Sequence, residues 1–166
     1  MPFSESLLPE FDEEMKNTRK LLECVPDGKF GYQPHTKSMN LGRLATHVAE
    51  LPSWTNSALD LEVLELGPDF KPHFATTKAE LLEMFDKAVA AARPKIVAAS
   101  DEDWEKIWTF KWEGKTVMSM PRSAVMRGTI MNHLIHHRAQ LGVYLRLNDI
   151  PLPATYGPSA DDRMGF

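Results

Sequence analysis

Apolar residues recur at three- and four-residue steps in four stretches of the chain, which predicts four amphipathic helices. The first runs from about Ser6 to Val25 and ends at the sequence Pro26-Asp27-Gly28. The second runs from about Met39 to Asp60, with Ser38 as its expected N-cap. Pro52 interrupts the second helix, and we expect a kink or a local opening of its hydrogen bonds there.

The third helix follows a polar connection, Leu61 to Thr76, that contains prolines. Thr77 and Glu80 have the spacing of a capping box, and the helix should reach about Ala99. Pro94 is expected to bend it or to end it early.

The segment from Ser100 to Met120 has a different pattern. Aromatic residues alternate with other residues from Trp108 to Trp112, and Glu113-Gly114-Lys115 follows as a turn. This pattern predicts a short hairpin or an irregular excursion before the last helix, which should run from about Pro121 to Asn148. The predicted fold is therefore all-α, an antiparallel four-helix bundle that forms a single domain over residues 1–166.

Composition excludes several classes of function. The 166 residues carry 19 Lys and Arg against 23 Asp and Glu, a net charge of -4, so we expect no nucleic acid as a partner. Cys24 is the only cysteine, which excludes an internal disulfide or a thiolate metal cluster. No stretch approaches the ~18 consecutive apolar residues of a membrane span, and residues 1–14 do not resemble a secretory signal. We therefore expect a soluble, cytoplasmic protein with no membrane association.

Histidines interrupt the apolar faces of two predicted helices. On the fourth helix the recurring positions are Met126, Ile130, His133, His137, Leu141 and Tyr144. The i, i+4 spacing of His133 and His137 places both rings on one side of the helix, and His47 interrupts the stripe of the second helix in the same way. Facing helices of a bundle can bring such residues together. Three imidazoles would hold a divalent metal and leave one position open, as in catalytic rather than structural sites.

A hydrogen-bonded core role is the alternative for each histidine, because helical sequences produce two histidines four residues apart by chance. Glu50 is a candidate catalytic residue that would orient a ligand or act as a base, although a helical Glu is usually solvated. Tyr144 is a second candidate, either as core or as a hydroxyl donor to the site. Arg138 and Gln140 could bond a ligand or a neighbouring helix, and His136 lies to one side of the stripe.

Three segments together resemble the DinB/YfiT-like family of proposed metalloenzymes, in its DinB-like branch. They are HLIHHRAQL with VYLR at 133–146, LATHVAE at 44–50, and the tail IPLPATYGPSAD at 150–161. Ala139 stands where the family often has glycine. The resemblance extends from about Ser6 to Asp162. It implies a four-helix bundle that is often dimeric, and a metal held by His47, His133 and His137.

The resemblance also implies a class of reaction, because some members of the family transfer or isomerise groups with low-molecular-weight thiols. We expect a metal-dependent enzyme, a thiol-dependent S-transferase acting on a small molecule as a homodimer. A metal-dependent hydrolase that uses the same site is an alternative, as is a non-catalytic metal-binding protein with a stress or binding role. Zinc is the first choice of ion, and imidazole also suits nickel, iron and copper.

Overall fold

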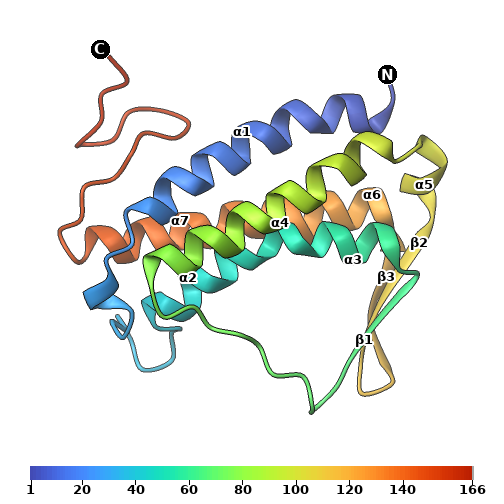
Figure 1. Ribbon diagram of the computed structural model, residues 1–166, viewed down its shortest axis with the longest axis horizontal. Helices are drawn as coiled ribbons and strands as arrows, with labels where there is room; N and C mark the ends of the chain where they lie inside the picture. The colour runs from blue at the N-terminus through green and yellow to red at the C-terminus, as the bar shows by residue number, and fades with distance from the viewer. Residues whose placement is uncertain (166) are drawn as a thin grey trace.

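The computed structural model describes residues 1–165 and shows long helices packed side by side, with a small sheet at one end (Figure 1). Phe166, the last residue of the predicted domain, lies outside the described residues. The longer helical elements are α1 (Phe3–Glu23), α2 (Leu41–Glu50), α3 (Trp54–Asp60), α4 (Lys78–Ala98) and α7 (His133–Arg146). Short turns of 3-10 helix, η1 (Asp27–Lys29) and η2 (Leu51–Ser53), a short α5 (Asp101–Glu105) and α6 (Arg122–Ala124), and a π-helical η3 (Val125–Asn132) complete the helical set.

The second rod consists of α2, η2 and α3, and its α-helical hydrogen bonding is interrupted where the sequence predicts. Pro52 lies in η2, the 3-10 turn that joins the two α-helices. The N-cap is Asn40 rather than Ser38, because the Asn40 side chain accepts the backbone N–H of Arg43 at 2.8 Å. The cap fixes the start of α2, and therefore the turn on which His47 lies.

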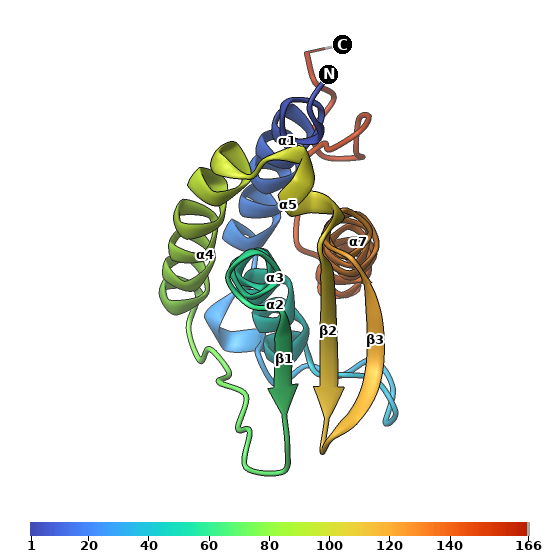
Figure 2. The same cartoon turned by 90° about the vertical axis from the view of Figure 1, so that its right-hand side faces the viewer.

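The prediction of an all-α four-helix bundle is wrong, because the chain also forms a mixed three-stranded sheet. The strands are β1 (Val63–Leu66), β2 (Ile107–Trp112) and β3 (Lys115–Pro121), in the order β1-β2-β3. The β2–β3 pair is the predicted hairpin, antiparallel with a bulge at Phe110/Lys111. β1 pairs with β2 in parallel, Val63 opposite Thr109, and lies in the polar connection after the second predicted helix, where no strand was expected. Figure 2 shows the strands projecting from the helical layer.

The third rod, α4, begins at the predicted cap, where the Thr77 hydroxyl accepts the Glu80 N–H at 3.2 Å. The Glu80 carboxylate instead accepts the backbone N–H of Thr76, at 2.7 Å, so the reciprocal half of the capping box is displaced by one residue. The helix continues through Pro94 to Ala98. It packs against α2 and against α1, which is the first rod. The fourth rod consists of α6, η3 and α7, and its α7 packs against α2 and α1.

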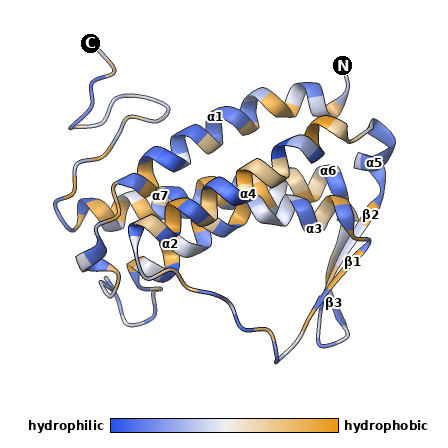
Figure 3. Ribbon diagram, in the orientation of Figure 1, coloured by the Kyte–Doolittle hydropathy of each residue, from blue (hydrophilic) through white to orange (hydrophobic). Residues whose placement is uncertain are grey.

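One hydrophobic core lies between the helical rods, and each long helix carries both apolar and polar faces (Figure 3). Fully buried side chains from all four rods include Phe11, Leu44, Phe85 and Leu141. Trp104 and Trp108 close the end of this core nearest the sheet, where their ring N–H groups donate to the Ser4 hydroxyl and the Ser57 carbonyl. Among the helices described, none has the length and apolar character needed to cross a membrane.

Candidate metal centre

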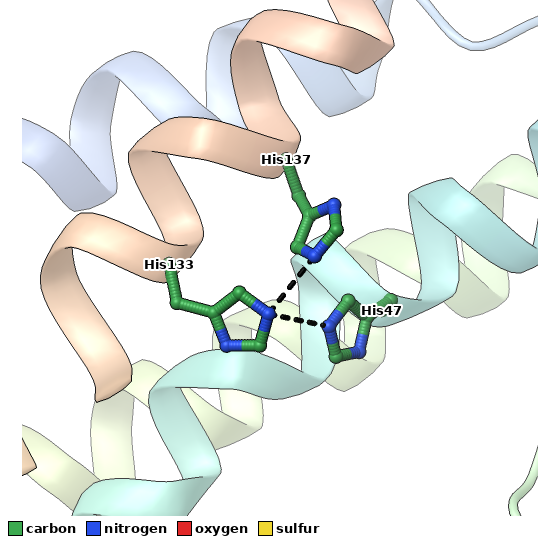
Figure 4. Close-up of side chains that lie close together, drawn as sticks. All are labelled: His47, His133 and His137. Carbon is green, nitrogen blue, oxygen red and sulfur yellow. Dashed lines mark hydrogen bonds between the residues drawn. The ribbon is translucent and has the colours of Figure 1, made fainter. Parts of the chain in front are cut away.

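Three histidines meet between the second and fourth rods of the fold. His47 comes from α2, and His133 and His137 come from successive turns of α7 (Figure 4). The Nε2 atom of His133 lies 2.9 Å from Nε2 of His137 and 3.3 Å from Nε2 of His47. One ligand atom from each ring lies within 4.8 Å of the others, a spacing that can hold a metal ion. The sequence therefore predicted this convergence correctly.

The second ring nitrogen of each histidine faces a hydrogen-bond acceptor. Nδ1 of His47 lies 2.7 Å from Glu50 Oε1, and Nδ1 of His137 lies 2.8 Å from Gln140 Oε1. Nδ1 of His133 lies 3.1 Å from the backbone carbonyl of Thr129. Such partners hold the proton of a neutral imidazole on Nδ1 and direct the lone pair of Nε2 into the cluster.

These contacts make the donor set fit a cation. A neutral imidazole has one N–H group, and in each ring an acceptor at Nδ1 claims that proton. Nε2 lone pairs 2.9 and 3.3 Å apart would repel one another without a proton or an ion between them. A divalent ion removes that repulsion for three rings at once, so the arrangement suits three neutral ligands of one ion.

Burial favours the same neutral state. All three histidines are half-buried. Removal from water lowers the pKa of His133 below its ordinary value, and the neighbouring His47 lowers it further. Burial also lowers the pKa of His137, with a partly opposing effect from its bond to Gln140. Both rings therefore stay available as metal ligands at pH values where a solvated imidazole would begin to bind a proton.

The π-helical segment η3 ends immediately before His133 and changes the phase of the fourth rod. A π-helix winds through i→i−5 hydrogen bonds, so it turns through a smaller angle per residue than an α-helix. The buried positions of α7 are Leu134, Arg138, Leu141 and Leu145. His133 and His137 therefore lie at the edge of the buried face, where a ligand can approach, and not at its centre as the uniform helical period predicted.

A pocket of about 220 Å³ adjoins the centre along α2. It lies between that helix and the segment that follows β1, and its lining residues are Met39, Arg43, Thr46, His47, Glu50, Pro72 and Phe74. Glu50 is the only carboxylate residue of this lining. The pocket gives small molecules access to the side of the centre formed by His47.

The other residues singled out in the sequence have separate positions. Gln140 supports His137, whereas Arg138 is buried and pairs with Glu14 of α1 at 2.6 Å. The ring of His136 lies 4.9 Å from that of His137 but is not part of the cluster. The candidate Tyr144 packs edge-on against Tyr32, with 6.2 Å between ring centroids. Its catalytic role stays a prediction, as does contact of Glu50 with a substrate.

The carbonyl of Thr129 is the one partner of the centre that the sequence did not indicate. Backbone carbonyls exist at every residue, so no residue type marks one that accepts a side-chain proton. The four-residue spacing from Thr129 to His133 is the only available signal, and it occurs throughout any helix.

The fold and the cluster define a class: a small mixed α/β protein built mainly of helices, with a three-histidine site able to hold a metal. Within that class, the chain belongs to the DinB family, whose sequence model matches residues 1–163. No curated protein matches the sequence.

Two solved structures share the fold. A DinB-like protein from Bacillus cereus is 24% identical, with a TM-score of 0.74 over 93% of this chain and 98% of the other. A DinB-like protein from Bacillus subtilis is 16% identical, with a TM-score of 0.66 over 95% and 99% of the two chains. Both structures therefore share the fold of this chain over nearly the whole length of each chain.

Proposed function

We propose that this protein is a metal-dependent enzyme in which His47, His133 and His137 hold one divalent ion. The observation that carries the proposal is the convergence of three Nε2 atoms while each Nδ1 faces an acceptor. Three protein ligands with a position left for water or substrate are typical of catalytic zinc sites. Zinc is the first choice, with nickel or iron as alternatives that imidazole also accepts.

The reaction we propose is transfer of a low-molecular-weight thiol to an electrophilic carbon of a small molecule. A carbon–sulfur bond forms, the bond from that carbon to its leaving group breaks, and the thiol proton departs with the leaving group. A divalent ion held here would lower the pKa of a thiol or water at the open position. Glu50 Oε1 accepts the Nδ1 proton of His47 at 2.7 Å, so this carboxylate already has a role in holding a ligand. A thiol loses its proton more readily than water does and needs less help from a base. This difference in acidity supports a thiol over the hydrolytic alternative.

Metal content tests the site. The protein, purified without added metal, should contain about one divalent ion per chain, and His47→Ala or His133→Ala should lose most of it. His136→Ala is a matched control, because its ring lies beside His137 yet outside the cluster. Equal metal content in all four proteins would refute the assignment.

Cobalt substitution separates an enzyme from a non-catalytic metal-binding protein. An open coordination position should let added thiols change the visible spectrum of the cobalt-loaded protein, because a sulfur ligand alters the cobalt environment. No spectral change with any thiol would favour the non-catalytic alternative. His137→Ala should abolish the cobalt spectrum and so serves as the negative control.

We also propose that the active form is a cytoplasmic homodimer. The exposed apolar side chains Val143 on α7 and Leu147 at its C-cap provide surface for such contact. Analytical ultracentrifugation should give twice the 18.8 kDa mass of the chain. A monomer at micromolar concentration would contradict the dimer without affecting the metal site.

A further inference from the structure

The pocket beside the metal centre contains a guanidinium that lacks a carboxylate partner. In the described part of the chain, several other arginines form ion pairs with acidic side chains: Arg19, Arg93, Arg127, Arg138 and Arg146. Arg43 forms none there. Its guanidinium carbon lies 5.8 Å from the centroid of the Phe74 ring, a cation–π contact that supports the side chain and leaves its N–H groups free.

Helix geometry places this cation close to the metal ligands. Arg43 precedes His47 by four residues on α2, so the two side chains lie on one face, about 6 Å apart along the helix axis. Both line the same pocket of about 220 Å³. Arg43 and Phe74 also line an adjoining pocket of about 390 Å³, so the guanidinium has open space on more than one side.

The charges of the pocket select a single negative charge. Arg43 is its cation and Glu50 is its anion. Glu50 repels any anion, but it repels a phosphate dianion about twice as strongly as a carboxylate with one charge. The planar fork of an arginine matches a carboxylate with two parallel hydrogen bonds. Met39 and Phe74 add apolar surface to the same lining, which suits a short carbon chain.

We propose that Arg43 binds a carboxylate on the ligand that occupies the open coordination position. The inference rests on the proposed function for that position, and it adds the class of ligand: a small molecule with its reacting group at one end and a carboxylate at the other. Arg43 acts as a specificity-determining residue. It contacts the ligand away from the reacting atoms, and its loss should leave the metal site intact.

Matched thiols test the assignment. The cobalt-loaded protein is titrated with 4-mercaptobutyrate and with its amide, which has the same length and no charge, and the visible spectrum gives each dissociation constant. The wild-type protein should prefer the carboxylate by about tenfold, the size of a charge-assisted hydrogen bond. Arg43→Gln should bind both thiols about equally. Lys71→Gln is the control, because it removes an exposed cation near the pocket wall that is not among the lining residues.

Several results would overturn the proposal. Equal affinity of the wild-type protein for the two thiols would do so, as would a preference that survives in Arg43→Gln. A preference lost equally in Lys71→Gln would indicate general surface charge instead. Tighter binding of 3-mercaptopropyl phosphate than of 4-mercaptobutyrate would contradict the choice of a monoanion.

A thiol-free measurement distinguishes this inference from the proposed function. If no thiol changes the cobalt spectrum, the proposed function fails, while binding of a carboxylate at Arg43 can still be measured. The carboxyl ¹³C signal of labelled butyrate should then broaden with the zinc-loaded wild-type protein and not with Arg43→Gln. The same broadening in both proteins, or in neither, would refute the role of Arg43.

Discussion

Replacing Glu50 by alanine should weaken metal binding without removing a ligand. Glu50 Oε1 lies 2.7 Å from His47 Nδ1, and its side chain is 32% exposed while that of His47 is 22% exposed. Hydrogen bonds to charged groups contribute about 1.5–3 kcal/mol. Partial exposure reduces this to roughly 1–2 kcal/mol, which corresponds to about a 5- to 30-fold higher dissociation constant. Loss of the carboxylate frees the His47 ring to rotate and makes its Nε2 a weaker donor.

Loss of Glu50 should weaken zinc binding more than loss of Gln140, the acceptor for His137. Gln140 is a neutral and more exposed acceptor for His137, so Gln140→Ala should raise the dissociation constant by only about 2- to 5-fold. Competition with a chromophoric zinc chelator measures each constant. Glu83→Ala, on the exposed surface of α4, is the control for loss of one negative charge. If Glu50→Ala binds zinc as tightly as the wild type, or more tightly than Gln140→Ala, the argument from ring orientation is refuted.

Further predictions concern stability. Arg138→Met should cost about 3–5 kcal/mol of unfolding free energy, because it leaves the Glu14 carboxylate buried without its cation. Adding Glu14→Gln should recover much of this loss, as measured by urea denaturation. Equal stability of the single and double variants would refute the pairing. In the metal-free protein, the pKa values of His133 and His137 are lowered. Their neutral rings therefore contribute fully to the free energy of unfolding above the ordinary imidazole pKa, and this contribution is lost as the pH falls through the folded-state pKa values. The urea midpoint should therefore fall between about pH 7 and pH 5, and a variant with both histidines changed to alanine should show a flatter profile. Asn40→Ala should cost about 1 kcal/mol through loss of the α2 cap, and a change within error would contradict that role.

The clustering of the three histidines could be predicted from the sequence because helical periodicity is a local property. The i, i+4 spacing fixes His133 and His137 on one side of α7 whatever surrounds them. That His47 faces them follows from the packing of α2 against α7. The apolar stripes of the two helices indicated this packing, and the resemblance to a family strengthened it. Glu50 and Gln140 each follow a histidine by three residues. That spacing made Glu50 a candidate, whereas Gln140 was named with Arg138 because it follows the histidine pair.

The phase of the last helix could not be predicted in this way. A stripe drawn from Met126 to Tyr144 assumes 100° per residue throughout, and the π-helical turns of η3 break that assumption. Arg138 consequently lies on the buried face and pairs with Glu14, while the histidines face the opening. Nothing in the residues 125–132 distinguishes π from α winding, because both bury apolar side chains of the same types.

The strand β1 escaped prediction for a different reason. β1 has only four residues, Val63–Leu66, and alternates between exposed and half-buried positions. Its stability comes from parallel pairing with β2, more than 40 residues later in the chain. The β2–β3 hairpin was visible because its turn is local, with Glu113 and Gly114 both at positive φ. The residues of a short strand such as β1 do not indicate which distant strand it pairs with.

X-ray absorption spectroscopy of the zinc-loaded protein counts the ligands of the ion itself. A three-histidine centre should give three imidazole nitrogens at about 2.0–2.1 Å with one further light atom, and that atom should be replaced by a sulfur at about 2.3 Å when a thiol is added. A wild-type spectrum with fewer than three imidazoles, or one that His133→Ala leaves unchanged, would contradict the three-histidine centre.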